Sequence, residues 1–104
     1  MNREDVLAKI SDIVDPELKI GIVDLGLIYD VRVDPAEDGK FNVDVDMTLT
    51  SIACPVGPAL KAAVQNRILR MDEVNLVNVY LVFDPPWDVR KHASEDAQME
   101  LGII

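Results

Sequence analysis

The strongest candidate for chemistry in this chain is its one cysteine, Cys54, which lies in the stretch TLTSIACPVGP from Thr48 to Pro58. This stretch ends a predicted strand in hydroxyl side chains and then begins a predicted helix. A thiol near a helix N-terminus is favoured as the thiolate, the form that attacks electrophiles and binds metals. The hydroxyls of Thr48, Thr50 and Ser51 could donate hydrogen bonds to the sulfur or to a bound anion.

Two features leave the state of Cys54 open. Free cysteines are often buried and act as small apolar residues, and spacing alone does not separate that role from a reactive one. Proline is favoured in the first turn of a helix, so Pro58 predicts a helix that begins near Gly57. Cys54 would then stand several residues upstream, and the helix dipole would act on it more weakly.

The ligand count limits what a thiol at position 54 can do alone. The chain has one cysteine and one histidine, whereas iron-sulfur clusters and structural zinc normally take four protein ligands. Further ligands would have to come from a second subunit, a client protein, a small thiol, or carboxylates such as Asp15 and Glu17. Disulfide exchange with an internal resolving cysteine is excluded.

Other chemically capable residues have simpler explanations. His92 lies in a polar stretch and is interpreted as a solvated histidine without an assigned role. Asp44 and Asp46 alternate along one face of a predicted strand, where they increase solubility and discourage edge pairing. Asp15 and Pro16 are sufficiently explained by the end of a helix and the turn that follows it.

Composition narrows the class of protein. The 104 residues are 49% hydrophobic, which fits one ordinary folded domain over residues 1–104. The formal charge of −9 would repel nucleic acid and anionic membrane surfaces, and no apolar run is long enough to span a bilayer. The N-terminus lacks a secretory signal and one cysteine cannot form an internal disulfide, so we expect a cytoplasmic protein.

Hydrophobic periodicity predicts an α+β fold in the order α-β-β-α-β. A three-stranded sheet is covered on one face by helices, and a short helix follows at the C-terminal end. The first two strands form a hairpin, and the sequence does not say which strand is central. The expected helices cover residues 2–14, 57–71 and 94–101, and the expected strands cover residues 27–33, 41–50 and 75–83.

Four ordered motifs extend over nearly the whole chain and resemble those of the metal-sulfur cluster biosynthesis family, which includes SufT-like and PaaD-like proteins. The motifs are DPEL at 15–18, IVDLGLIYDV at 22–31, MTLTSIACP at 47–55 and FDPPW at 83–87. Each motif alone would be a weak signal, whereas the four in this order are specific.

The resemblance implies a non-enzymatic accessory factor in the assembly of iron-sulfur clusters or their transfer to client apoproteins. It implies that Cys54 is a transient cluster or sulfur ligand, with Asp15, Glu17, Thr50 and Ser51 around it. No stable cofactor is expected. The implied partners are iron-sulfur scaffold or carrier proteins and clients, and a homodimer could supply a second thiol, although no feature of the sequence requires one.

Two alternative functions stay open beside the accessory role. An interaction adaptor would dock clients through its acidic surface and would need no reactive thiol. A thiol-dependent enzyme, or a PaaD-like helper that serves one metallo-oxygenase, would use the same loop for a narrower purpose.

Overall fold

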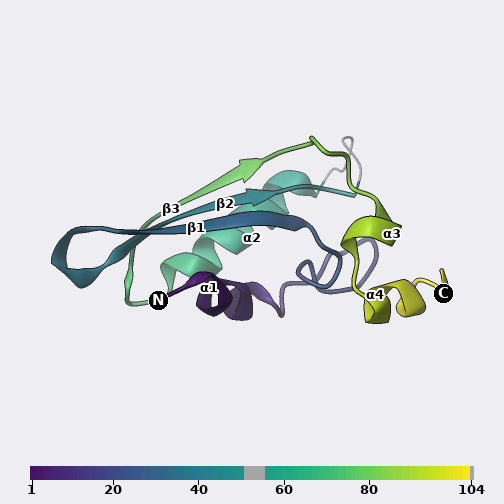
Figure 1. Ribbon diagram of the computed structural model, residues 1–104, viewed down its shortest axis with the longest axis horizontal. Coiled ribbons are helices and arrows are strands. Elements are labelled where there is room, and N and C mark those ends of the chain that lie inside the picture. The colour runs from purple at the N-terminus through teal and green to yellow at the C-terminus, as the bar shows by residue number, and fades with distance from the viewer. Residues whose placement is uncertain (51–55, 104) are drawn as a thin grey trace.

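The structure is a computed structural model that describes residues 1–50 and 56–103, so Ser51 and Cys54 lie outside the described residues. It measures 47 × 25 × 22 Å along its principal axes. The sheet runs along the long axis, with helices on one of its faces (Figure 1). Among the described residues, no helix is long and apolar enough to cross a membrane.

Helix α1 (Arg3–Ile10) follows directly on Asn2, the first residue of the expected helix, and ends earlier than expected. The side chain of Asn2 accepts a hydrogen bond from the backbone N–H of Asp5, and the Asp5 carboxylate accepts one from the N–H of Asn2. The donor–acceptor distance is 3.0 Å in both bonds. This reciprocal cap fixes the start. The predicted end at Val14 is wrong, because Val14 has left the helix and forms an antiparallel bridge to Gly21.

The sheet consists of β1 (Ile28–Pro35), β2 (Phe41–Met47) and β3 (Val74–Leu81), in the spatial order β1-β2-β3. The predicted hairpin of β1 and β2 is confirmed, since they pair antiparallel across the turn η1 (Glu37–Gly39). Strand β3 runs parallel to β2 on its other side. The central strand is therefore β2, which the sequence left open.

Helix α2 (Gly57–Leu69) connects β2 to β3 and packs on the sheet. Its buried residues Leu60, Val64 and Ile68 recur every four positions and so share one face. They meet a core formed by Val43, Val45 and the other inward residues of the sheet. The predicted helix is confirmed, and it starts at Gly57 with Pro58 in its first turn.

The strand expected over residues 41–50 is too long, because the paired positions of β2 with β1 and β3 end at Met47. Leu49 still points into the core, with 5% of its surface exposed. Strand β3 has already ended beside Leu49. The last hydrogen bond between β2 and β3 runs from the N–H of Val82 to the carbonyl of Met47, with a donor–acceptor distance of 2.8 Å. Thr50 thus follows the sheet and does not belong to it.

Two short helices complete the chain. Helix α4 (Glu95–Glu100) confirms the expected C-terminal helix, with the Ser94 hydroxyl as its cap accepting from the N–H of Ala97 at 3.1 Å. Helix α3 (Val89–His92) was not predicted. Figure 1 shows α3, α4 and the long connection after α1 gathered at the end of the sheet where β2 and β3 finish. This end of the sheet contains the candidate site.

Candidate functional site

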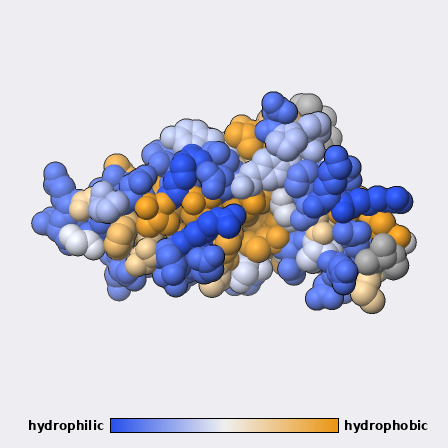
Figure 2. Space-filling view, in the orientation of Figure 1, coloured by the Kyte–Doolittle hydropathy of each residue, from blue (hydrophilic) through white to orange (hydrophobic). Residues whose placement is uncertain are grey.

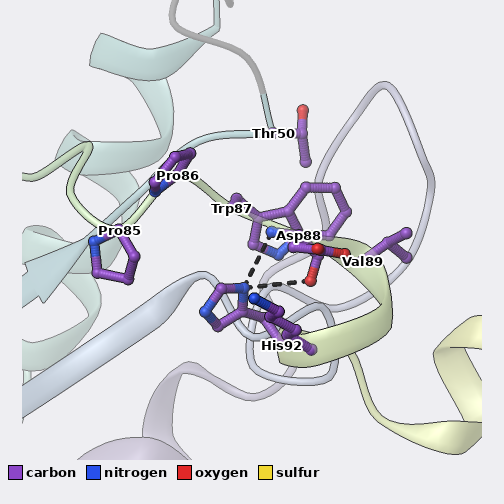
Figure 3. Close-up of a pocket in the computed structure, with 8 residues that line it drawn as sticks. Thr50, Pro85, Pro86, Trp87, Asp88, Val89 and His92 are labelled. Carbon is purple, nitrogen blue, oxygen red and sulfur yellow. Dashed lines mark hydrogen bonds between the residues drawn. The ribbon is translucent and has the colours of Figure 1, made fainter.

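An open cleft with a volume of ≈ 680 Å³ lies at this end of the sheet. Figure 3 shows its walls, to which the FDPPW motif and α3 contribute most of the side chains. The described residues that line it are Thr50, Pro85, Pro86, Trp87, Asp88, Val89, Lys91 and His92. Thr50 is therefore the link between the cleft and the segment 51–55 that carries Cys54.

Two long-range hydrogen bonds hold the FDPPW segment in place. The indole Nε1–H of Trp87 donates to the carbonyl of Leu25 at 2.7 Å, and the Tyr29 hydroxyl donates to the carbonyl of Pro85 at 2.9 Å. Trp87 also packs against the core. The motif after β3 is thus tied to the motif that precedes and begins β1, which explains why these two sequences, about sixty positions apart, serve one site.

His92, interpreted from the sequence as a solvated histidine, lies half-buried in the wall of this open cleft. Its Nδ1 lies 2.9 Å from the backbone nitrogen of Asp88 and 3.1 Å from the carbonyl oxygen of the same residue, so it accepts from the N–H in one tautomer and donates to the carbonyl in the other. The ring also packs on Tyr29, with 5.1 Å between the ring centroids. One feature of the neighbouring sequence indicates the short helix that places His92 here. Asp88 caps α3 with its side chain, which accepts a hydrogen bond from the N–H of Arg90.

The partly buried phenol of Tyr29 lies beside Thr48 at the inner side of this region. Burial raises the pKa of Tyr29, and the neighbouring Thr48 hydroxyl opposes the shift. Thr48 itself is fully buried, and its Oγ1 forms no hydrogen bond of normal length to the described residues. Of the hydroxyls expected to serve the thiol, Thr48 lies inside the core and Thr50 lines the cleft, whereas Ser51 falls outside the described residues.

Asp15 is a structural carboxylate with one oxygen to spare. Only 1% of its surface is exposed. Its Oδ1 accepts from the backbone N–H groups of Glu17 at 2.8 Å and Leu18 at 3.1 Å, which confirms the expected turn. Its Oδ2 is buried without a hydrogen-bond partner among the described residues. The turn therefore accounts for one carboxylate oxygen of Asp15 and leaves the other available.

Glu17 is exposed on the same turn, and neither Asp15 nor Glu17 is among the described residues that line the cleft. The turn is closed by Lys19, whose backbone adopts φ +59° and whose N–H donates to the carbonyl of Asp15 at 2.7 Å. The structure thus brings Thr50 into the cleft and places Asp15 and Glu17 on a separate turn of the connection after α1.

Replacing Asp15 tests the turn. Asp15→Ala removes the acceptor of two backbone N–H groups and should lower the free energy of unfolding by about 2 kcal/mol. Asp15→Ser retains one acceptor oxygen at a similar position and should cost about half as much. Urea unfolding followed by the fluorescence of Trp87, the one tryptophan of the chain, measures both. An Ala variant as stable as the native protein would show that these bonds do not hold the turn.

The start of α2 decides how the helix can act on the thiol. Because α2 begins at Gly57, Cys54 precedes it by three positions, as the presence of Pro58 predicts. Val56, the N-cap residue, provides no side-chain hydrogen bond to the first turn. The N–H groups of that turn are therefore not occupied by a side chain of the cap, and they can contribute to an electropositive environment for an anion.

The donor set of the chain does not fit a self-sufficient metal centre. Within residues 1–50 and 56–103, no three residues of the types His, Cys, Asp and Glu are grouped so that they could hold a metal ion. Because the whole sequence contains one cysteine and one histidine, a cluster with four protein ligands cannot be completed by these side chains alone. The missing ligands of any bound cluster would therefore have to come from another molecule.

Comparison with known proteins identifies the family. Residues 3–80 match the iron-sulfur cluster assembly protein family, and the chain belongs to it. It is 40% identical over 101 residues to the Fe-S protein maturation auxiliary factor YitW of Bacillus subtilis, covering 97% of this chain and 94% of the relative. It is 41% identical over 91 residues to the Fe-S protein maturation auxiliary factor SufT of Staphylococcus aureus, covering 88% and 98%.

Solved structures agree with this assignment. A domain of unknown function from Bacillus anthracis superposes with a TM-score of 0.84 at 36% identity, covering 97% of this chain and 92% of that one. A conserved hypothetical protein from Thermotoga maritima gives a TM-score of 0.81 at 34% identity, covering 98% and 95%. The predicted α+β fold and the resemblance to SufT-like proteins are both confirmed.

Proposed function

We propose that this protein is an auxiliary factor in the maturation of iron-sulfur proteins, with Cys54 as a transient ligand for the cluster or for its sulfur. The role is supported by the family and by relatives named as Fe-S protein maturation auxiliary factors. A neighbour in structure from Mycobacterium tuberculosis, with a TM-score of 0.53, is described as associated with [Fe-S] complex assembly and repair. We propose a binding and transfer role without catalysis of its own.

The single observation that carries the ligand role is the isolated thiol in a segment that joins the cleft to the start of α2. Thr50 precedes this segment at the cleft wall, and the first turn of α2 follows it without a side-chain cap. One thiolate gives a cluster a point of attachment, while the missing ligands make that attachment incomplete. An incompletely ligated cluster is easily passed to a client that offers more cysteines.

The partners follow from the same ligand count. A scaffold or carrier protein must deliver the cluster, and a client apoprotein must complete its ligation. The acidic turn at Asp15 and Glu17, together with the hydroxyls of Thr50 and Ser51, is proposed to shape the surroundings of the thiol. The support for this is the spare, buried Oδ2 of Asp15 and the place of Thr50 at the entrance to segment 51–55.

Anaerobic reconstitution with iron and sulfide tests the ligand role. The native protein should develop the visible absorbance of an iron-sulfur chromophore and lose it on gel filtration, because one thiolate holds the cluster weakly. Serine has almost the same size as cysteine but is a poor ligand for iron. The Cys54→Ser variant should therefore develop little absorbance above a blank without protein. Equal absorbance in the native protein and the serine variant would contradict the role of Cys54 and leave the interaction adaptor as the better explanation.

A further inference from the structure

The FDPPW segment, residues 83–87, forms one wall of the cleft beyond the end of β3. Pro85 and Pro86 have no N–H to donate, and both are exposed. Figure 2 shows apolar residues gathered in a band along the middle of the displayed face and mostly hydrophilic residues at the end where α3 and α4 lie. The position of this wall therefore depends strongly on individual hydrogen bonds, and one of them runs from Tyr29 to the Pro85 carbonyl.

Tyr29 contacts residues of both walls of the cleft. Its hydroxyl donates to the Pro85 carbonyl at 2.9 Å, and its ring packs on the ring of His92. Pro85 and His92 both line the cleft. The phenol also lies beside the hydroxyl of Thr48, two positions before Thr50, which lines the cleft where the chain leaves β2. Tyr29 is not among the described residues that line the cleft, so it acts on the cleft through the residues it contacts.

The hydroxyl of Thr48 lacks a partner and lies beside an oxygen that can accept its proton. Thr48 is fully buried, and its Oγ1 has no hydrogen-bond partner among the described residues. A buried hydroxyl that stays unpaired is costly. A phenol oxygen that donates its own proton to one group can still accept from another. Thr48 opposes the rise that burial causes in the pKa of Tyr29, which is the effect of a donor to the phenol oxygen.

We propose that Tyr29 is a positioning residue that joins the two walls of the cleft through a chain of two hydrogen bonds. The Thr48 hydroxyl donates to the Tyr29 oxygen, and the Tyr29 hydroxyl donates to the Pro85 carbonyl. The structure records the second bond, and the first is the inferred one. The direction of the chain is set by the Pro85 carbonyl, which can only accept, so the phenol oxygen is left to accept from Thr48.

The chain of hydrogen bonds links the stretch that follows β2 to the FDPPW motif. Thr50, two positions after Thr48, lines the cleft together with Pro85, so the chain fixes the distance between these two parts of the wall. A cleft of fixed width places a bound partner reproducibly, and reacting groups must be held closely to react fast. This consequence for cluster transfer rests on the proposed function of Cys54, whereas the chain itself can be tested without a cluster.

A double-mutant cycle with Thr48→Val and Tyr29→Phe tests the inferred bond. Each substitution removes one hydroxyl and leaves the shape of the side chain almost unchanged. Thr48→Val should raise the equilibrium constant of unfolding about fivefold in the native background, because a buried hydrogen bond is lost. In the Tyr29→Phe background the acceptor is absent, so the same substitution should leave the constant unchanged or lower it. Equal effects of Thr48→Val in the two backgrounds, measured by urea unfolding, would contradict the chain.

The ionisation of Tyr29 gives a spectroscopic signature of the same bond. Tyr80→Phe removes the other tyrosine of the chain, so the ultraviolet absorbance of tyrosinate then reports on Tyr29 alone. Because the Thr48 hydroxyl lowers the pKa of Tyr29 against the effect of burial, Thr48→Val should shift this pKa upward. Thr48→Ser keeps the donor and should restore the native value. A pKa of Tyr29 that is the same with valine as with threonine would overturn the inferred bond.

Hydrogen exchange at one N–H tests the positioning role. Tyr29→Phe keeps the ring but cannot donate to Pro85, so the FDPPW wall should open locally more often. The indole N–H of Trp87, which donates to the Leu25 carbonyl, should then exchange with solvent about fivefold faster, as NMR can measure. Gly39→Ala is the matched control, because it strains a positive-φ glycine in the turn at the opposite end of the sheet (Figure 1). Equal acceleration of exchange by both variants would contradict a separate opening of this wall.

Client activation separates a failure of the positioning role from a failure of the proposed function. Tyr29→Phe keeps Cys54, so it should still accelerate the transfer of a cluster to an apo-client. The acceleration should be several-fold smaller than with the native chain, because the cleft wall is held less firmly. Full acceleration by Tyr29→Phe would contradict the positioning role. If Cys54→Ser also gives full acceleration, the proposed function fails, and the unfolding cycle and the pKa of Tyr29 still decide whether the chain of hydrogen bonds exists.

Discussion

Gly26→Ala should destabilise this protein by about 4 kcal/mol or more, a range reached by few single substitutions. A Cβ at this position would lie 2.0 Å from the carbonyl oxygen of His92 and 2.8 Å from its Cβ. Gly26 also has φ +75°, where an L-residue costs roughly 1–2 kcal/mol by itself. Because the closest atom belongs to the backbone, relief requires α3 to separate from the loop before β1.

Gly39→Ala is the matched control. Gly39 has φ +72°, and no atom lies within 4 Å of a Cβ built on it. Its variant should therefore show the conformational cost alone, about 1–2 kcal/mol. Urea unfolding of both variants measures the difference, and the fluorescence of Trp87 reports on the segment that would be displaced. Equal losses of stability for the two variants would show that the close approach of Gly26 to His92 does not contribute to the cost of the Gly26→Ala substitution.

The elements with local signals were predictable from the sequence. Asn2 caps α1 and Ser94 caps α4 through side chains that accept from the following turn. The alternating residues of β2 gave its position and its buried face, and the spacing of Leu60, Val64 and Ile68 gave α2. Each of these patterns depends on neighbours within a few positions, so it is visible without knowledge of the fold.

The arrangement of the site was only partly predictable, because it depends on contacts between distant segments. The short helix α3 is positioned by the bond from Trp87 to Leu25 and by the approach of His92 to Gly26. Its four residues have no periodicity long enough to signal a helix. The position of His92 in the cleft wall was not visible from the sequence for the same reason. The identity of the central strand also depends on pairing, which no single strand encodes.

The candidate site residues show the same division. The turn at Asp15 was predictable from its sequence, since Asp before Pro favours this geometry. The sequence could not show that Asp15 is buried with a spare oxygen, or that Thr50 and not Glu17 lines the cleft. Burial and lining are properties of the packed structure. Cys54, the residue singled out first, lies outside the described residues, and its role stays a proposal.

The second large effect is expected for Cys54→Ser in cluster transfer. If Cys54 is the attachment point, the serine variant should lose all of the acceleration that the native protein gives to the activation of an iron-sulfur client. Serine is nearly isosteric with cysteine but is a much weaker ligand for iron, so the substitution removes the ligand and little else. Stability should change by less than about 1 kcal/mol, as urea unfolding can verify.

The most direct test of the account is therefore the rate at which an apo-enzyme that requires an iron-sulfur cluster gains activity from a cluster-loaded scaffold. The reaction is followed anaerobically without further protein, with the native chain, and with Cys54→Ser at the same concentration. The account predicts that the native chain accelerates activation of the apo-enzyme. It predicts that the Cys54→Ser variant leaves the rate equal to that of the reaction without added protein. Equal acceleration by the native chain and by a folded Cys54→Ser variant would contradict it.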